Sequence, residues 1–127
     1  MPHITIEYSS NLRSLDESWV MLQVNRSLLN LGIFMDADIK TRMVCQASFR
    51  IGVEAAEEDR HAFVAAEVAL LSGRDFSVRE LLGQTLLKTL ERCCPSEGGL
   101  QTQVTVHVGE LESELYFKSV LKGEAGS

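Results

Sequence analysis

The sequence predicts an α+β fold in which two tandem β-α-β units form a four-stranded sheet with two helices on one face. Three observations lead to this prediction. Apolar and polar residues alternate in several segments, two other segments repeat apolar residues at helical spacing, and the two halves of the chain show the same order of elements. The 127 residues fit a single domain over 1–127. Its two repeats span about 2–52 and 61–110, and a loose tail follows at 119–127.

The first half of the chain is predicted to run as strand, helix, strand. Residues 3–8 alternate between apolar and polar side chains, which is typical of a half-buried strand. The sequence SLDE at residues 14–17 has the form of a capping box, and the broad apolar stripe behind it predicts a helix that lies on a sheet. Residues 39–51 alternate again, so we expect a long strand with a basic side that carries Lys40 and Arg42.

The second half repeats this order after an acidic connection at residues 52–60. Residues 61–71 are apolar on both sides except at Glu67, which is typical of a strand that is covered on both faces. A second capping box at residues 77–80 begins the next predicted helix, and residues 101–108 alternate once more. Aligning the two capping boxes defines the internal repeat. Each unit is long enough for a right-handed crossover between parallel strands.

The predicted fold leaves one face of the sheet without a cover. Two helices cover only one face, yet the third predicted strand is apolar on both sides. The chain has little left with which to bury the second face. We therefore expect a homo-oligomer in which the sheets of different subunits pack against each other.

The charge balance limits the classes of partner. There are 18 acidic and 12 basic residues, which gives a formal net charge of −6. Nucleic-acid-binding proteins carry basic faces, so no nucleic-acid partner is expected. The longest apolar run is too short to span a bilayer, so no membrane partner is expected either. Any site for an anion must be local.

The cysteines and the N-terminus indicate a reducing compartment. Cys45, Cys93 and Cys94 make neither a disulfide framework nor a metal-binding spacing. No secretory leader is recognisable at the N-terminus. We therefore expect a cytoplasmic protein without a metal site.

Pro2 stands directly before the first predicted strand, and two interpretations are open. A proline at the start of an edge strand costs little, because its missing N–H is not needed there. If Met1 is removed, however, Pro2 becomes the one residue of the chain with a basic secondary amine.

Three basic residues are candidates for an anion site. Lys40 and Arg42 are two residues apart on one strand face, so their side chains can converge on one anion. Their alternative interpretation is a solvated basic strand face. Arg74 lies in the turn before the second predicted helix, and its position alone favours an exposed arginine.

Five stretches, in this order along the chain, resemble the tautomerase superfamily and, within it, the 5-carboxymethyl-2-hydroxymuconate isomerases. They are MPHITIEYSSNL, VNRSLLNLGIF, DIKTRMV, SGRDFSVRELLGQTLL and ELYFK, and they reach to about Lys118. None of these stretches is specific by itself. Their order and their placement on the two repeats make the resemblance.

The resemblance implies a cytoplasmic homotrimer built around three packed sheets. It implies an enzyme of aromatic catabolism, in homoprotocatechuate degradation, that uses neither a metal nor an organic cofactor. Such an enzyme converts a dienol carboxylate, such as 5-carboxymethyl-2-hydroxymuconate, to its conjugated ketone by moving a proton. The small anionic substrate is a di- or tricarboxylate.

The resemblance also assigns roles to four residues. Pro2 is the catalytic base, and Arg74, Lys40 and Arg42 bind the carboxylates of the substrate. Lys40 stands where the family usually has arginine, so it keeps the charge but loses the bidentate fork. This departure leaves open a tautomerase-fold protein that acts on another unsaturated oxo-acid. A non-catalytic ligand-binding trimer is a further alternative if Met1 is retained, because the nitrogen of an acylated Pro2 is an amide.

Three more residues are weighed as pocket residues. Phe34 and Phe117 could wall an apolar pocket, although core packing is the favoured prediction for both. His3 follows Pro2 directly and could tune an amine there, but it lies on the opposite side of the strand from Ile4, so a structural role is at least as well supported.

Overall fold

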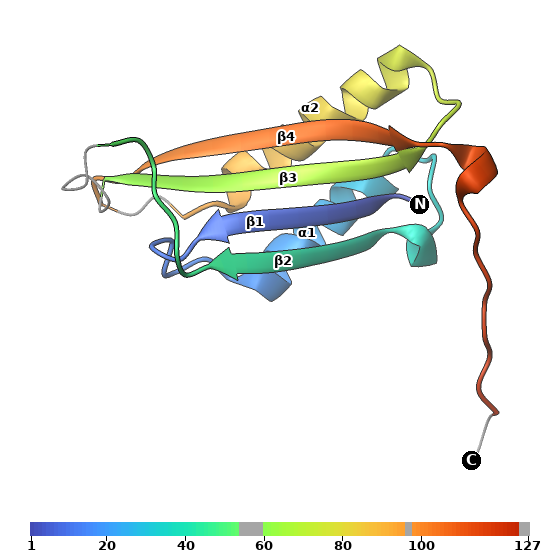
Figure 1. The fold of residues 1–127 in the computed structure, drawn as a ribbon, viewed down its shortest axis with the longest axis horizontal. Coiled ribbons are helices and arrows are strands. Elements are labelled where there is room, and N and C mark those ends of the chain that lie inside the picture. The colour runs from blue at the N-terminus through green and yellow to red at the C-terminus, as the bar shows by residue number, and fades with distance from the viewer. Residues whose placement is uncertain (54–59, 96–97, 125–127) are drawn as a thin grey trace.

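Four strands form one mixed sheet, and two helices cover one face of it (Figure 1). The structure is a computed structural model and describes residues 1–53, 60–95 and 98–124. The elements are β1 (His3–Ser9), α1 (Glu17–Leu29), η1 (Asp36–Asp38), β2 (Lys40–Gln46), β3 (His61–Leu71), α2 (Phe76–Cys93), β4 (Gln101–Leu111) and η3 (Ser113–Leu115). The strand order is β2-β1-β3-β4. Each β-α-β unit pairs its own strands in parallel, and β1 pairs with β3 in antiparallel fashion. The predicted fold class is confirmed.

The two helices begin at aspartates and not at the predicted capping boxes. Asp16 is the N-cap of α1, and its Oδ1 accepts a hydrogen bond from the backbone N–H of Trp19 at 3.1 Å. Asp75 is the N-cap of α2. Ser14 lies before α1 and Ser77 lies inside α2, so the capping-box prediction is wrong, and the repeat alignment built on it is wrong too. Serine and aspartate cap helices about equally well, so neighbouring candidates are not distinguished by local sequence.

The core lies between the sheet and the helices. Ile4, Ile6 and Tyr8 of β1 point into it, as their alternation predicts. Both helices bury an apolar stripe at the spacing of one helix face. These stripes consist of Val20, Val24 and Leu28 on α1 and of Leu82, Leu86 and Leu90 on α2.

Strand lengths follow the partner strand more than the local pattern. β2 ends at Gln46, earlier than the predicted residue 51, because its partner β1 ends at Ser9, the residue that pairs with Gln46. β4 continues to Leu111, beyond the predicted end, because β3 runs on to Leu71 and pairs with it. A strand without a neighbour has no ladder hydrogen bonds to hold it extended.

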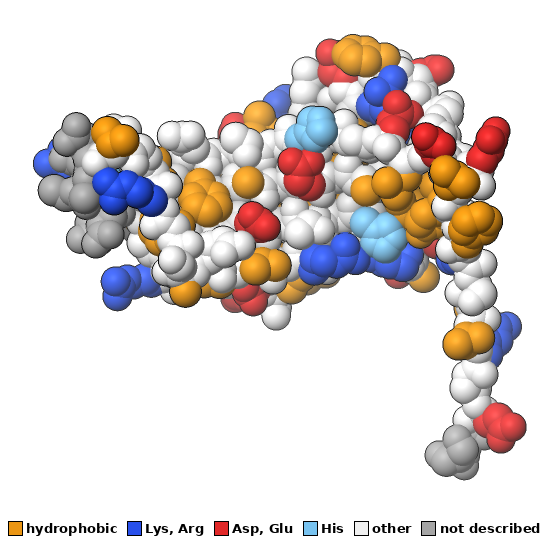
Figure 2. All heavy atoms as spheres, in the orientation of Figure 1, with side chains coloured by type: hydrophobic (Ala, Val, Ile, Leu, Met, Phe, Trp, Pro, Cys, Tyr) orange, Lys and Arg blue, Asp and Glu red, His pale blue; other side chains and the backbone are white. Residues whose placement is uncertain are grey.

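The sheet face opposite the helices carries the other half of each alternation, and Figure 2 shows it as an open surface of mixed chemistry. Glu67 is exposed there, whereas Ala65 and Ala69 beside it on β3 are half-buried. The described residues of one chain leave this face open. Its burial by other subunits therefore stays a prediction.

The chain leaves the body of the molecule after η3 (Figure 1). We call residues 116–124 the C-terminal arm. Phe117 is 83% exposed and Leu121 is 92% exposed on this arm, so the prediction that Phe117 packs in the core is wrong. The predicted tail lies on the arm as far as residue 124, and residues 125–127 fall outside the described residues. Most of the predicted acidic connection, residues 54–59, falls outside them as well.

Candidate functional site at the N-terminal end of the sheet

Four segments that are far apart in the sequence meet at the end of the sheet where β1 begins (Figure 1). β1 and β2 start there because they are parallel, and β3 and β4 end there because β3 is antiparallel to β1. The turn after β3 is tied to the segment after β4 by Ser72 and Ser113, whose hydroxyl oxygens lie 2.9 Å apart. The topology thus brings the N-terminus and the end of β4 to one edge of the sheet.

We call the polar side chains at this edge the N-terminal cluster. Its members come from β1, η1, β2, the turn after β3 and the C-terminal arm. They are His3, Asp38, Lys40, Arg42, Arg74, Tyr116 and Lys118.

Pro2 is buried directly before β1, and its carbonyl oxygen accepts a hydrogen bond from the backbone N–H of Lys40 at 3.1 Å. This bond fixes Pro2 against the start of β2. The preceding α-amine, that of Met1, is partly buried. Burial is the main cause that lowers the pKa of this amine below its ordinary value, and the cations of Lys40, Lys118 and Arg74 add to the effect. Asp38 opposes it. The surroundings therefore favour a neutral amine at this position.

Lys40 and Arg42 lie on the same face of β2, as their spacing predicts, at the rungs that pair with His3 and Thr5 of β1. Their side chains make different contacts. The Nζ of Lys40 donates to the carbonyl oxygen of Asp38 at 3.3 Å, beside the N-terminus. The Arg42 guanidinium lies against His3, with 3.0 Å between Nη2 and Nδ1, and it donates to Thr5 Oγ1 at 3.5 Å.

Arg74 is half-buried, and its position is defined by two contacts with the segment between α1 and η1. Its guanidinium carbon lies 4.9 Å from the centre of the Phe34 ring, a distance that allows a cation–π interaction. Its Nη2 donates to the carbonyl oxygen of Ile33 at 3.4 Å. Phe34 itself is buried in the core, as predicted, so packing in the core fixes the ring that Arg74 contacts.

The sequence analysis missed Asp38, Lys118 and Tyr116. Lys118 Nζ pairs with Asp38 Oδ1 at 3.2 Å. The Lys118 ammonium lowers the pKa of Asp38, with smaller contributions from the N-terminal amine and Lys40. The Tyr116 hydroxyl lies 3.2 Å from His3 Nε2. The one signal for Tyr116 and Lys118 was the ELYFK stretch in the resemblance, because no local pattern reveals where a chain end returns to the fold.

The chemistry of the N-terminal cluster suits a small anion. The cluster contains four cationic side chains and only one carboxylate, although the whole chain has a net charge of −6. Arginines and lysines bind carboxylates, and a neutral amine among them can accept a proton. Within residues 1–53, 60–95 and 98–124, no three His, Cys, Asp or Glu side chains are grouped so that they could hold a metal ion. No helix in the same ranges is long and apolar enough to cross a bilayer.

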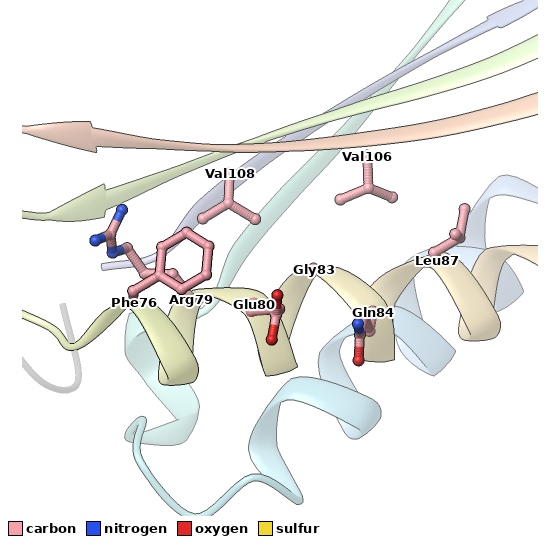
Figure 3. Close-up of a pocket in the computed structure, with 8 residues that line it drawn as sticks. All are labelled: Phe76, Arg79, Glu80, Gly83, Gln84, Leu87, Val106 and Val108. Carbon is pink, nitrogen blue, oxygen red and sulfur yellow. The ribbon is translucent and has the colours of Figure 1, made fainter.

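Away from the N-terminal cluster, a hollow lies between α2 and β4 (Figure 3) and has a volume of about 320 Å³. It is a mostly apolar groove along the edge strand of the sheet. α2 approaches β4 closely at Gly83, where a Cβ atom would lie 3.2 Å from Val108 Cγ2. The lining residues are Phe76, Arg79, Glu80, Gly83, Gln84, Leu87, Val106 and Val108. They include none of the described members of the N-terminal cluster, so we place the candidate site at that cluster.

Comparisons with known proteins agree with the fold. The chain matches the family of 5-carboxymethyl-2-hydroxymuconate isomerases over residues 2–119. Among solved structures, it is similar to a 5-carboxymethyl-2-hydroxymuconate isomerase from Deinococcus radiodurans R1, with a TM-score of 0.84 at 22% identity over 93% of this chain and 88% of that one. It is also similar to a 5-carboxymethyl-2-hydroxymuconate delta-isomerase, with a TM-score of 0.81 at 21% identity over 98% and 95% of the two chains.

A third solved structure is more distantly similar to the chain. A fused 4-OT wild-type protein, described as a symmetric trimer, has a TM-score of 0.69 at 12% identity over 88% of this chain and 87% of that one. No curated protein sequence matches the chain. The match over residues 2–119 covers nearly the whole chain, so the protein belongs to the 5-carboxymethyl-2-hydroxymuconate isomerase family and is an isomerase with the tautomerase fold.

Proposed function

We propose that the protein converts an unsaturated dienol carboxylate, such as 5-carboxymethyl-2-hydroxymuconate, to its conjugated ketone without a cofactor. Pro2, freed by removal of Met1, is the proton-transfer base. The observation that carries this proposal is the electrostatic environment of the N-terminus. Partial burial, and then the cations of Lys40, Lys118 and Arg74, lower the pKa of the Met1 amine, which directly precedes Pro2.

The proposed reaction moves one proton and needs no oxidant or reductant. The Pro2 amine takes the proton from the enol oxygen, the electron pair shifts through the conjugated chain, and the resulting ammonium returns the proton to carbon. A free α-amine has an ordinary pKa of about 8. Lowering that pKa brings the amine close to neutral pH, where general base catalysis is most effective.

The carboxylates of the substrate are proposed to bind the cations of the cluster. Arg74 rests on Phe34, so its guanidinium is partly ordered before a ligand arrives. Lys40 and Arg42 offer two more positive charges on the adjacent strand. These cations also stabilise the negative charge that develops on the dienolate in the transition state.

Assembly as a homotrimer is part of the proposal. The fold is similar to that of a protein described as a symmetric trimer, and the chain presents two surfaces that another copy could cover. One is the open face of the sheet. The other is the C-terminal arm, on which Phe117, Val120 and Leu121 are exposed apolar side chains. Light scattering coupled to size-exclusion chromatography should give three times the mass of the chain.

The decisive experiment for the activity compares wild-type protein with Pro2→Ala. Intact mass first establishes that Met1 has been removed from both proteins. Ketonisation of 5-carboxymethyl-2-hydroxymuconate is then followed by absorbance. Pro2→Ala keeps a free primary amine but loses the rigid ring that holds the lone pair in one direction, so kcat/KM should fall by part of the about 10²- to 10⁴-fold that general base catalysis contributes, while the melting temperature stays unchanged. Full activity in protein that keeps Met1 would show that Pro2 is not the base.

A second candidate substrate class is favoured by Lys40. Its single ammonium cannot bind a carboxylate through the two-point fork of an arginine. An isomerase that acts on a smaller unsaturated oxo-acid would fit this change. Turnover of phenylenolpyruvate without turnover of the tricarboxylate would identify this class, and binding without any turnover would indicate a ligand-binding trimer.

A further inference from the structure

His3 is contacted at both of its ring nitrogens. Nδ1 lies 3.0 Å from Nη2 of Arg42, and Nε2 lies 3.2 Å from the hydroxyl oxygen of Tyr116. The ring of Tyr116 also meets the imidazole edge-on, with 6.5 Å between their centres. Basic side chains gather beside a histidine on the open face of the sheet (Figure 2).

These two contacts define the proton position on the ring. A guanidinium carries only donors, so Nδ1 of His3 must accept the hydrogen bond from Arg42 and cannot carry a proton. The single proton of the neutral imidazole is therefore on Nε2, where it donates to the hydroxyl oxygen of Tyr116. A protonated imidazolium would direct an N–H group from Nδ1 at the guanidinium and would break the contact with Arg42.

The charges around His3 favour the neutral ring. Burial lowers the pKa of His3, and the cations of Arg42, Lys40 and the N-terminal amine lower it further. On β3 and β4, the hollow that His3 shares with Arg42 also contains three titratable side chains. They are Glu67, His107 and Glu110.

All three of these side chains are already paired with another residue. The Glu67 carboxylate lies 2.8 Å from His107 Nδ1, so the acid nearest in register to Arg42 has a partner of its own. Glu110 pairs with Arg79 of α2 at 3.4 Å. The strongest polar contact of the Arg42 guanidinium among the described residues is therefore the one with His3, because its bond to Thr5 is long, at 3.5 Å.

We propose that neutral His3 is a positioning residue for Arg42, with Tyr116 fixing its tautomer, and that protonation of His3 releases Arg42 and weakens anion binding at the candidate site. Arg42 is exposed, and a long unheld arginine loses rotamer freedom when it binds a ligand. His3 orders this side chain in advance. The link to substrate binding rests on the proposed function, whereas the tautomer of His3 does not.

The kinetic test compares three variants of His3 and its partner from pH 5 to pH 8. His3→Ala removes the acceptor, so KM for 5-carboxymethyl-2-hydroxymuconate should rise about five- to tenfold with little change in kcat, which is the signature of lost ground-state positioning. In His3→Asn, the amide oxygen can replace Nδ1 and does not titrate. This variant should keep a low KM and lose the increase in KM that wild type shows at acidic pH. Tyr116→Phe should raise KM less than His3→Ala does.

His107→Asn is the matched control, because His107 lies on the same sheet face but pairs with Glu67 and makes no hydrogen bond with Arg42 among the described residues. Its pH profile of KM should follow that of wild type. If His3→Ala leaves KM unchanged, if wild type shows no increase in KM at acidic pH, or if His3→Asn keeps such an increase, the positioning role is wrong.

A second measurement tests the tautomer without any substrate. In protein labelled with ¹⁵N-histidine, the NMR spectrum at pH 7 should show His3 protonated on Nε2 and unprotonated on Nδ1. Arg42→Gln should raise the midpoint of the His3 titration. A proton on Nδ1 at pH 7 would overturn the proposal even if the enzyme is active. If the wild type turns over no dienol, the proposed function fails, and the NMR spectrum still decides the state of His3.

Discussion

The two β-α-β repeats share one topology but differ in chemistry at the starts of their strands. In the first repeat, β2 begins with Lys40 and carries Arg42 two residues later on the same face. In the second repeat, the equivalent positions of β4 are Gln101 and Gln103. Because β1 and β3 are antiparallel, the two sets of strand starts lie at opposite ends of the sheet (Figure 1). The repeated fold therefore offers two similar ends, and the first carries cations at the two strand positions where the second carries glutamines.

The backbone before the first strand of each repeat differs as well. Pro2 precedes β1 and can become a free amine when Met1 is removed. Arg60 precedes β3 in the middle of the chain, so its nitrogen is always an amide. An amide nitrogen is not a base, and the second repeat cannot supply the proposed proton acceptor in this way. The comparison shows that one fold can offer two equivalent places for a site, which differ here in their side chains and in the backbone nitrogen before the first strand.

Among the tests of this comparison, the largest effect is expected from making the first repeat resemble the second. In Lys40→Gln/Arg42→Gln, both cations of β2 become the neutral residue that β4 carries. A hydrogen bond to a charged group contributes about 1.5–3 kcal/mol, so kcat/KM for the dienol should fall by about 10- to 100-fold or more for the pair. Steady-state kinetics at pH 7 measure this loss.

The matched control for that experiment is Gln101→Ala/Gln103→Ala in the second repeat. Both glutamines are exposed on the open face of one chain, at the other end of the sheet. This variant should keep wild-type kinetics. Equal losses in the two double variants would mean that the sheet face as a whole supports activity, and that the difference in charge between the repeats does not matter.

An intermediate effect is expected at the two helix starts. Asp16 accepts a hydrogen bond from the backbone of α1, so Asp16→Ala should lower the free energy of unfolding by about 1 kcal/mol. Among the described atoms, Asp75 accepts no cap hydrogen bond, and Asp75→Ala should cost only about 0.3 kcal/mol from the helix dipole. Urea denaturation monitored by circular dichroism measures both values. The interpretation of the two caps fails if Asp75→Ala is the more damaging change.

The smallest effect concerns the ion pair between Asp38 and Lys118, which ties the C-terminal arm to the first repeat. The pKa of Asp38 is lowered in the folded protein, so the pair stabilises the fold above the unfolded pKa of the carboxyl. This stabilisation is lost as the pH falls through the lowered folded value. Lys118→Gln should therefore reduce the melting temperature slightly at pH 7 and leave it unchanged near pH 2.

Lys122→Gln, farther along the same arm, is the control for charge alone. Differential scanning calorimetry at both pH values compares the three proteins. A deficit in Lys118→Gln that is equally large in acid would assign the effect to packing of the arm and not to the charge of Asp38.

The elements of each repeat were predictable because their signals are local. The apolar stripes of α1 and α2 and the alternation of β1 follow from the contact of each segment with a single core. The bounds of β3 were predicted correctly at His61–Leu71 for the same reason. The ends of β2 and β4 were not, since a strand stops where its partner stops, and Ser9 and Leu71 belong to other segments.

The candidate site was predictable in part. The alternation of side chains along a strand placed Lys40 and Arg42 on one face, and Figure 2 shows that face as open surface. The contacts of these side chains were beyond sequence reasoning. His3, Tyr116 and Arg42 form one hydrogen-bonded group only because the antiparallel pairing of β1 and β3 returns the end of β4 to the N-terminus.

By itself, the sequence determined the two β-α-β units, the apolar face of each element and the unusual amine that Pro2 can provide. These properties depend on residue type and on spacing along a few turns or rungs. The tertiary structure alone decided that the α-amine of Met1, directly before Pro2, is partly buried and lies near Lys40, Lys118 and Arg74, so that burial and these cations lower its pKa. The reason is physical: electrostatic interactions depend on distance through space and on burial, and neither quantity is set before the sheet is assembled.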